Sequence, residues 1–120
     1  MKGTVNGAEF NGTNAIALAG PDSILSIYGG FFQESSLVPP YVFLHLCPYR
    51  GVGIYSLVNP PVNSTTVSYA AIDSAAYYQV QTQSAYGTVT ITATSPIQGA
   101  FSFTALDSTK VSGTFVAKVP

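Results

Sequence analysis

The last third of the chain alternates apolar residues with small polar ones, and glycine-bearing turns divide it into three runs. The runs cover residues 87–94, 99–105 and 110–118. A period of two along the chain is typical of strands that bury one face and expose the other. We therefore expect this part of the chain to form successive antiparallel strands.

Short runs of the same kind fill the rest of the chain, and no apolar pattern with helical spacing interrupts them. The expected strands are residues 3–10, 14–19, 23–29, 41–47, 51–57, 66–72, 76–83, 87–94, 98–106 and 110–118. Short strands joined by short turns are usually antiparallel neighbours in a meander. The pattern predicts a single all-β domain over residues 1–120, a mainly antiparallel β-sandwich or flattened β-barrel of about eight to ten strands.

The turns and the inward faces follow from the same pattern. Asn6-Gly7 suits a tight turn, and residues 29–40 look like the longest loop. The motif Gly-x-Φ-x-Φ, where Φ is apolar, starts at Gly87, Gly99 and Gly113, which suggests that these strands turn the same face inward. The expected core residues are Ile16, Leu18, Leu25, Ile27, Val42, Leu44, Leu46, Ile54, Tyr69, Val80, Val89, Ile91, Phe101, Phe103, Val111 and Phe115.

Composition narrows the possible partners. Charged residues make up only 8% of the chain, against about 25% in an average soluble protein, and the net charge is −1. Nucleic acid is therefore not an expected partner, because no basic patch is available for phosphates. The apolar runs are too short for a transmembrane segment, and the residues after Met1 lack the apolar stretch of a signal peptide.

His45 and Cys47 lie two residues apart on one expected strand, and so on one face of it. They could be two ligands of a soft metal, but a zinc site needs three or four ligands and the chain has no second His or Cys. They could also be a thiolate and its base, but side chains at this spacing stand about 7 Å apart. The simpler interpretation is a small thiol and an imidazole lining one face of a sheet, opposite the better core face of Val42, Leu44 and Leu46.

The five carboxylates do not form a local pair, as a glycosidase would need across the bond that it cleaves. They are Glu9, Asp22, Glu34, Asp73 and Asp107, all in expected turns or near strand ends. We expect no enzymatic activity, no catalytic residue, no metal and no cofactor. A hydrolase would require carboxylates, or His45 with a nucleophile, to converge in one cleft.

Two short segments are the candidate ligand-binding residues. Tyr77, Gln79 and Gln81 share one face of an expected strand, where an aromatic ring flanked by amides could stack on and hydrogen-bond a sugar. The alternative is an ordinary polar strand face. Phe31 and Phe32 are consecutive, so both cannot face the core of a regular strand, and one of them could mark a contact site.

Both ends of the chain resemble a family of small domains of unknown function in secreted or lipid-anchored proteins of Bacteroidota. The resemblance is carried by residues 4–10, 87–92, 99–105 and 111–115, roughly a third of the chain. It implies an all-β domain, export from the cytoplasm to the periplasm or cell surface, and a lipid anchor upstream of this sequence. It implies no catalytic residues.

These observations favour a non-enzymatic module of the cell envelope that binds a glycan, a small ligand or a protein partner. The alternative is a structural or adhesin-like surface subunit that self-associates, which unpaired edge strands and a concentration-dependent dimer would favour. The sequence does not define the ligand, the partner or the oligomeric state.

Overall fold

The computed structural model describes the chain except for residues 12–13, 21–22, 34–35, 61–66, 74–80 and 120. The described residues form strands and turns. The strands are β1 (Lys2–Val5), β2 (Ala8–Asn11), β3 (Asn14–Gly20), β4 (Ile24–Gln33), β5 (Ser36–Leu46), β6 (Gly53–Val58), β7 (Tyr69–Asp73), β8 (Gln81–Thr94), β9 (Ile97–Ala105) and β10 (Lys110–Ala117). No helix in the described part of the chain is long and apolar enough to span a membrane.

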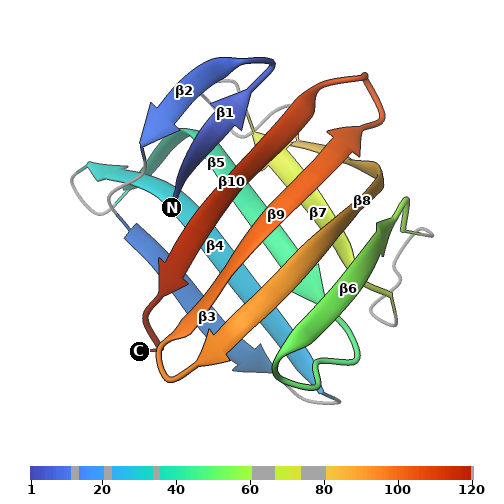
Figure 1. The fold of residues 1–120 in the computed structure, drawn as a ribbon. Coiled ribbons are helices and arrows are strands. Elements are labelled where there is room, and N and C mark those ends of the chain that lie inside the picture. Colours follow the sequence, from blue (N-terminus) through green and yellow to red (C-terminus); the bar gives the residue numbers. More distant parts are fainter. Residues whose placement is uncertain (12–13, 21–22, 34–35, 61–66, 74–80, 120) are drawn as a thin grey trace.

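The strands form one curled antiparallel sheet in the order β2-β1-β10-β9-β8-β7-β5-β4-β3, with β6 also paired to β8. In Figure 1 it folds into a front layer of β2, β1, β10, β9, β8 and β6 over a back layer of β3, β4, β5 and β7. Along one side, the layers meet where Ala17 N–H donates to Lys118 O and Lys118 N–H donates to Ala15 O, both at 2.9 Å. The expected all-β sandwich or flattened barrel is confirmed.

β8 belongs to both layers and changes partner at Ser84. Residues 81–83 pair with β7, and residues 86–91 pair with β6. The fully buried Ser84 hydroxyl accepts a hydrogen bond from Ala70 N–H at 3.0 Å and donates one to Val58 O at 2.8 Å. One side chain thus serves main-chain groups of β7 and β6 at the point where these strands part.

Phenylalanines from the front layer fill much of the core, and glycines stand opposite them. Phe101 lies 6.3 Å from both Phe103 and Phe115, measured between ring centroids, and all three rings are buried. Across the strands Gly87 pairs with Phe103, Gly99 with Phe115 and Gly113 with Phe101. This explains the repeated Gly-x-Φ-x-Φ motif: its glycines occupy inward positions and leave room for a neighbouring ring.

The expected loop at residues 29–40 is wrong, because most of it belongs to a long hairpin of β4 and β5. Phe31 pairs with Val38, and an irregularity between Gly29 and Phe31 takes up the unequal number of residues. Within the described residues, Tyr41 is the last residue of β5 that pairs with β7, opposite Asp73.

Other strand boundaries differ at turns. The expected strand 3–10 is divided by a turn at Asn6-Gly7, where both residues have positive φ, so the tight turn expected there is confirmed. The expected break before residue 87 is absent, because β8 is continuous from Gln81 to Thr94.

The core prediction is correct for most aliphatic and aromatic positions and wrong at four. Ile16, Leu18, Ile54 and Tyr69 all point away from the core; Val80 lies outside the described residues. β3 alternates Ala with larger apolar residues, so either face could have been buried. Ala15 and Ala17 are the buried residues of β3, and they lie at the seam where the main chains of β3 and Lys118 are hydrogen-bonded.

Candidate ligand-binding face

The outward face of the back layer carries a cluster of aromatic side chains. Because Val42, Leu44 and Leu46 of β5 face the core, Phe43 and His45 point to the other side of the sheet. Tyr28 on β4 is directly opposite Phe43, and Tyr69 on β7 is directly opposite His45. We call Tyr28, Phe43, His45 and Tyr69 the aromatic face.

The four rings form one connected cluster. The ring centroids are 4.9 Å apart for Tyr28 and Phe43, and 4.9 Å apart for His45 and Tyr69. Phe43 connects the two pairs, with its ring 5.8 Å from Tyr69 in an edge-on arrangement and 6.1 Å from His45. Such tilted and edge-on pairs are favourable for aromatic rings and hold each ring in a defined orientation.

Burial differs within the aromatic face. His45 is only 6% exposed, whereas Tyr28, Phe43 and Tyr69 are partly accessible. Burial raises the pKa of Tyr69 above its ordinary value, and the neighbouring Tyr28 raises it further. Tyr69 therefore keeps its phenolic proton at neutral pH, and the aromatic face offers a hydroxyl donor beside apolar rings.

The cross-strand neighbours of the aromatic face are uncharged. The row through Tyr28 and Phe43 continues to Ile16 on one side and Ala71 on the other. Ser26 is opposite His45. This arrangement can stack against a flat apolar surface and exchange hydrogen bonds at its tyrosine hydroxyl groups.

The predicted stripe of ligand-binding residues falls mostly outside the described chain. Tyr77 and Gln79 belong to residues 74–80, so their part in a site stays a prediction. Gln81 is the first residue of β8, and its backbone is opposite Asp73, which in turn is opposite Tyr41. Phe43 is in the cross-strand row of Ala71 and Gln83, and the row of Gln81 is two residues further along each strand.

Phe31 and Phe32 are in β4, opposite Val38 and Leu37 of β5. The described part of the chain does not include their side chains. Their backbones continue the β4–β5 hairpin beyond the row of Tyr28 and Phe43, so the expected contact role stays a prediction as well.

His45 and Cys47 do not form a pair on one strand, because β5 ends at Leu46 and Cys47 lies in the bend that follows. The Ser68 hydroxyl accepts a hydrogen bond from Cys47 N–H at 2.9 Å and donates to Cys47 O at 3.2 Å. Ser68 thereby holds the chain where β5 stops. Within the described residues no three His, Cys, Asp or Glu side chains gather as a metal site.

Among the described carboxylates, Asp107 has a role in local structure. Asp107 lies in the turn between β9 and β10 and accepts a hydrogen bond from Thr109 N–H at 3.0 Å. The hydrogen bonds to Thr109 hold the pKa of Asp107 below its ordinary value. Glu9 is exposed on the edge strand β2, whereas Asp22 and Glu34 lie outside the described residues.

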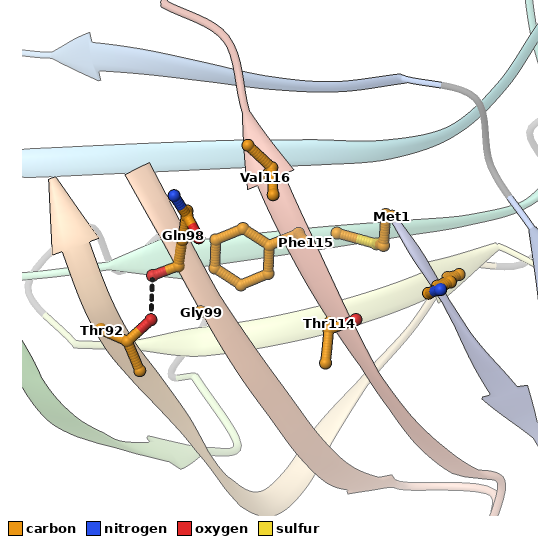
Figure 2. A pocket seen from close by; sticks show the side chains of 8 residues that line it. Met1, Thr92, Gln98, Gly99, Thr114, Phe115 and Val116 are labelled. Carbon is orange, nitrogen blue, oxygen red and sulfur yellow. Dashed lines mark hydrogen bonds between the residues drawn. The ribbon is translucent and has the colours of Figure 1, made fainter. Parts of the chain in front are cut away.

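The outer face of the front layer carries many hydroxyl side chains and has hollows. One hollow over β8, β9 and β10 has a volume of about 560 Å³. Figure 2 shows residues that line it, among them Thr92, whose hydroxyl donates a hydrogen bond to Gln98 O at 3.3 Å. Next to it, one cross-strand row consists of hydroxyl residues from five strands: Ser56, Thr88, Ser102, Ser112 and Thr4. Ser and Thr on the exposed face of this sheet take the place of the charged residues that the chain largely lacks.

Sequence reasoning missed Tyr28 and placed Tyr69 in the core. The available signal was the alternation of Phe43 and His45 with the core residues of β5, which already indicated a second aromatic surface. Comparison with known proteins adds no family to this picture: no family model, no curated protein and no solved structure matches the chain.

Proposed function

We propose that the protein is a non-enzymatic binding module of the cell envelope, and that its aromatic face binds a glycan. The observation that carries the proposal is the contact cluster of Tyr28, Phe43, His45 and Tyr69 on the outer side of the back layer. Aromatic rings held by the sheet lose little conformational freedom when a ligand stacks on them.

The chemistry of the face favours a neutral, hydroxyl-bearing ring as the ligand. The apolar side of a pyranose can lie on the partly accessible rings, while its hydroxyls exchange hydrogen bonds with the tyrosine hydroxyls. An anionic ligand would need Lys or Arg, and the cross-strand neighbours of these rings carry no charge.

The envelope location rests on two sequence properties. The first is the resemblance of the chain ends to exported and lipid-anchored domains of Bacteroidota. The second is the low content of charged side chains, with hydroxyl residues taking their place on the exposed faces.

A glycan array followed by calorimetric titration tests the proposal. We expect Tyr28→Ala and Tyr69→Phe to weaken binding of the glycan that the wild type selects, because one removes a stacking ring and the other removes only a hydroxyl. The matched control is Tyr86→Ala, which deletes a ring that is 63% exposed on the front layer.

Thermal melting of each variant shows whether the fold persists. Loss of binding in folded Tyr28→Ala with retention in Tyr86→Ala supports the proposal. Glycan binding that survives Tyr28→Ala and Tyr69→Phe, or no binding to any glycan at millimolar concentration, would overturn it and leave a small apolar ligand or a protein partner as the next candidates.

A further inference from the structure

β6 is an edge strand with exposed apolar side chains. In the described part of the chain its only strand partner is β8. Ile54 is 73% exposed, and Val52 and Val58 are exposed on the same side of the strand. Tyr86, directly opposite Val58 on β8, extends this apolar patch. Surface positions of this kind in a row mark contact sites more often than isolated exposed residues do.

The sequence of β6 lacks the features that usually prevent an exposed edge strand from pairing with another strand. The sequence has no charged residue between Arg50 and Asp73, so β6 has neither a charge of its own nor a charged neighbour in the chain for two residues on either side. The edge strand β2 is different, because it has four residues and carries the exposed Glu9. Natural edges are blunted by charges, prolines or short length, and β6, six residues long, has none of these.

Main-chain groups of β6 point toward the free side. Val58 N–H donates to Ser68 O at 3.1 Å, so it is turned away from β8. Because orientation alternates along an antiparallel strand, Ile54 and Ser56 are also turned away from β8. A hollow of about 420 Å³ lies beside these residues, and its lining also includes Cys47, Arg50 and Val67. The free side of β6 therefore combines available backbone groups with room for a strand.

We propose that a second copy of this chain pairs with this edge, β6 against β6 in antiparallel orientation, about a two-fold axis at Tyr55. Since Val58 N–H is already used, the groups that remain are those of Ile54 and Ser56. An axis at Tyr55 sets Ile54 opposite Ser56 of the partner subunit and Ser56 opposite the partner's Ile54. Each of these pairs exchanges two backbone hydrogen bonds.

A second copy fits this edge better than an unrelated strand for two reasons. The pairing is self-complementary, because the same short uncharged segment, residues 53–58, supplies both sides. It also makes one continuous sheet of the two front layers. This interface lies on a different part of the molecule from the aromatic face and does not depend on glycan binding.

Sedimentation equilibrium from micromolar to millimolar concentration tests the dimer. The wild type should show a concentration-dependent monomer–dimer equilibrium, and Ile54→Lys should be monomeric throughout, because a lysine on an edge strand opposes pairing. The matched control is Val116→Lys, at a position 56% exposed on β10, which should associate like the wild type. A monomeric wild type at millimolar concentration, or an unchanged dimer in folded Ile54→Lys, would overturn the proposal.

Cross-linking tests the register. In a Cys47→Ala background, Ile54→Cys and Ser56→Cys proteins are oxidised separately and as a mixture. The proposed axis predicts a disulfide-linked dimer mainly in the mixture, because opposite residues in a hydrogen-bonded pair have Cα atoms about 5.5 Å apart, within disulfide reach. Efficient cross-linking of Ser56→Cys alone would place the axis at Ser56 and contradict the proposed register.

Discussion

At the scale of single residues, Ser84 combines full burial with two hydrogen bonds to the main chain of different strands. Replacing it with alanine leaves Ala70 N–H and Val58 O without this partner, in a place that water does not reach. We expect Ser84→Ala to lower the free energy of unfolding by about 2 kcal/mol, as for other buried groups that lose their partners.

Urea unfolding of Ser84→Ala and Ser102→Ala measures this effect. Ser102 is exposed on the front layer, so its variant should stay within about 0.5 kcal/mol of the wild type. Equal stabilities of the two variants would show that Ser84 does not hold the junction of β6, β7 and β8.

Gly99 provides a second test at this scale. A Cβ atom there would collide with Thr90 O and lie 3.0 Å from Phe115 Cζ, so Gly99→Ala should be destabilising by about 1–3 kcal/mol, as overpacked cores are. The control is Gly20→Ala, where the nearest atom would be Ile24 Cβ at an ordinary 3.6 Å. If chemical denaturation showed Gly20→Ala to be less stable than Gly99→Ala, the close packing of Gly99 against Thr90 O and Phe115 would be contradicted.

The raised pKa of Tyr69 should make the stability of the folded protein depend on alkaline pH. Its pKa is raised in the folded protein by burial and by Tyr28, so above the ordinary tyrosine value of about 10 the unfolded chain loses this proton first. The stabilising contribution is thus complete below pH 10 and declines as pH rises further. In urea titrations at several alkaline pH values, Tyr69→Phe should lose stability less steeply than the wild type, with Tyr49 responsible for part of the remaining slope because its pKa is raised too. An identical slope would mean that Tyr69 titrates as in the unfolded chain.

At the scale of elements, the sequence was most informative where polar and apolar residues alternate strictly. In β9 the residues on one face are apolar or glycine and most of those on the other are polar, so its inward face was predicted correctly, and the expected range 98–106 differs from Ile97–Ala105 by one residue at each end. β3 and β6 carry apolar residues on both faces. Their orientation depends on neighbours far away in the sequence, such as Lys118 beside Ala17 and the β8 partner of Ile54.

The candidate site was predictable to a similar degree. Alternation within β5 showed that Phe43 and His45 share the face opposite the core, which is a local property. Tyr28 and Tyr69 join them only through the register of β4 and β7 with β5. No local pattern encodes that register, so the cluster became visible only in the folded chain.

At the scale of the whole molecule, the curled sheet is closed on one side by the bridge between β3 and the residue after β10. Ala17 N–H donates to Lys118 O, and Lys118 N–H donates to Ala15 O. If these hydrogen bonds hold the two layers together, the amide protons of Ala17 and Lys118 should exchange slowly with solvent. Lys118→Pro removes the N–H that donates to Ala15 O and leaves the pairing of the other strands in place.

Hydrogen exchange followed by NMR tests the closure. In Lys118→Pro, we expect faster exchange at the Ala17 amide and at inward residues of β3, with a loss of about 1 kcal/mol or more in stability for the missing hydrogen bond. Lys118→Ala is the matched control: its side chain is exposed and its amide remains, so exchange at Ala17 should stay slow. Fast exchange at Ala17 in the wild type would mean that the sheet is open along this side, and that the alanines of β3 face inward for a reason other than the close approach of the layers.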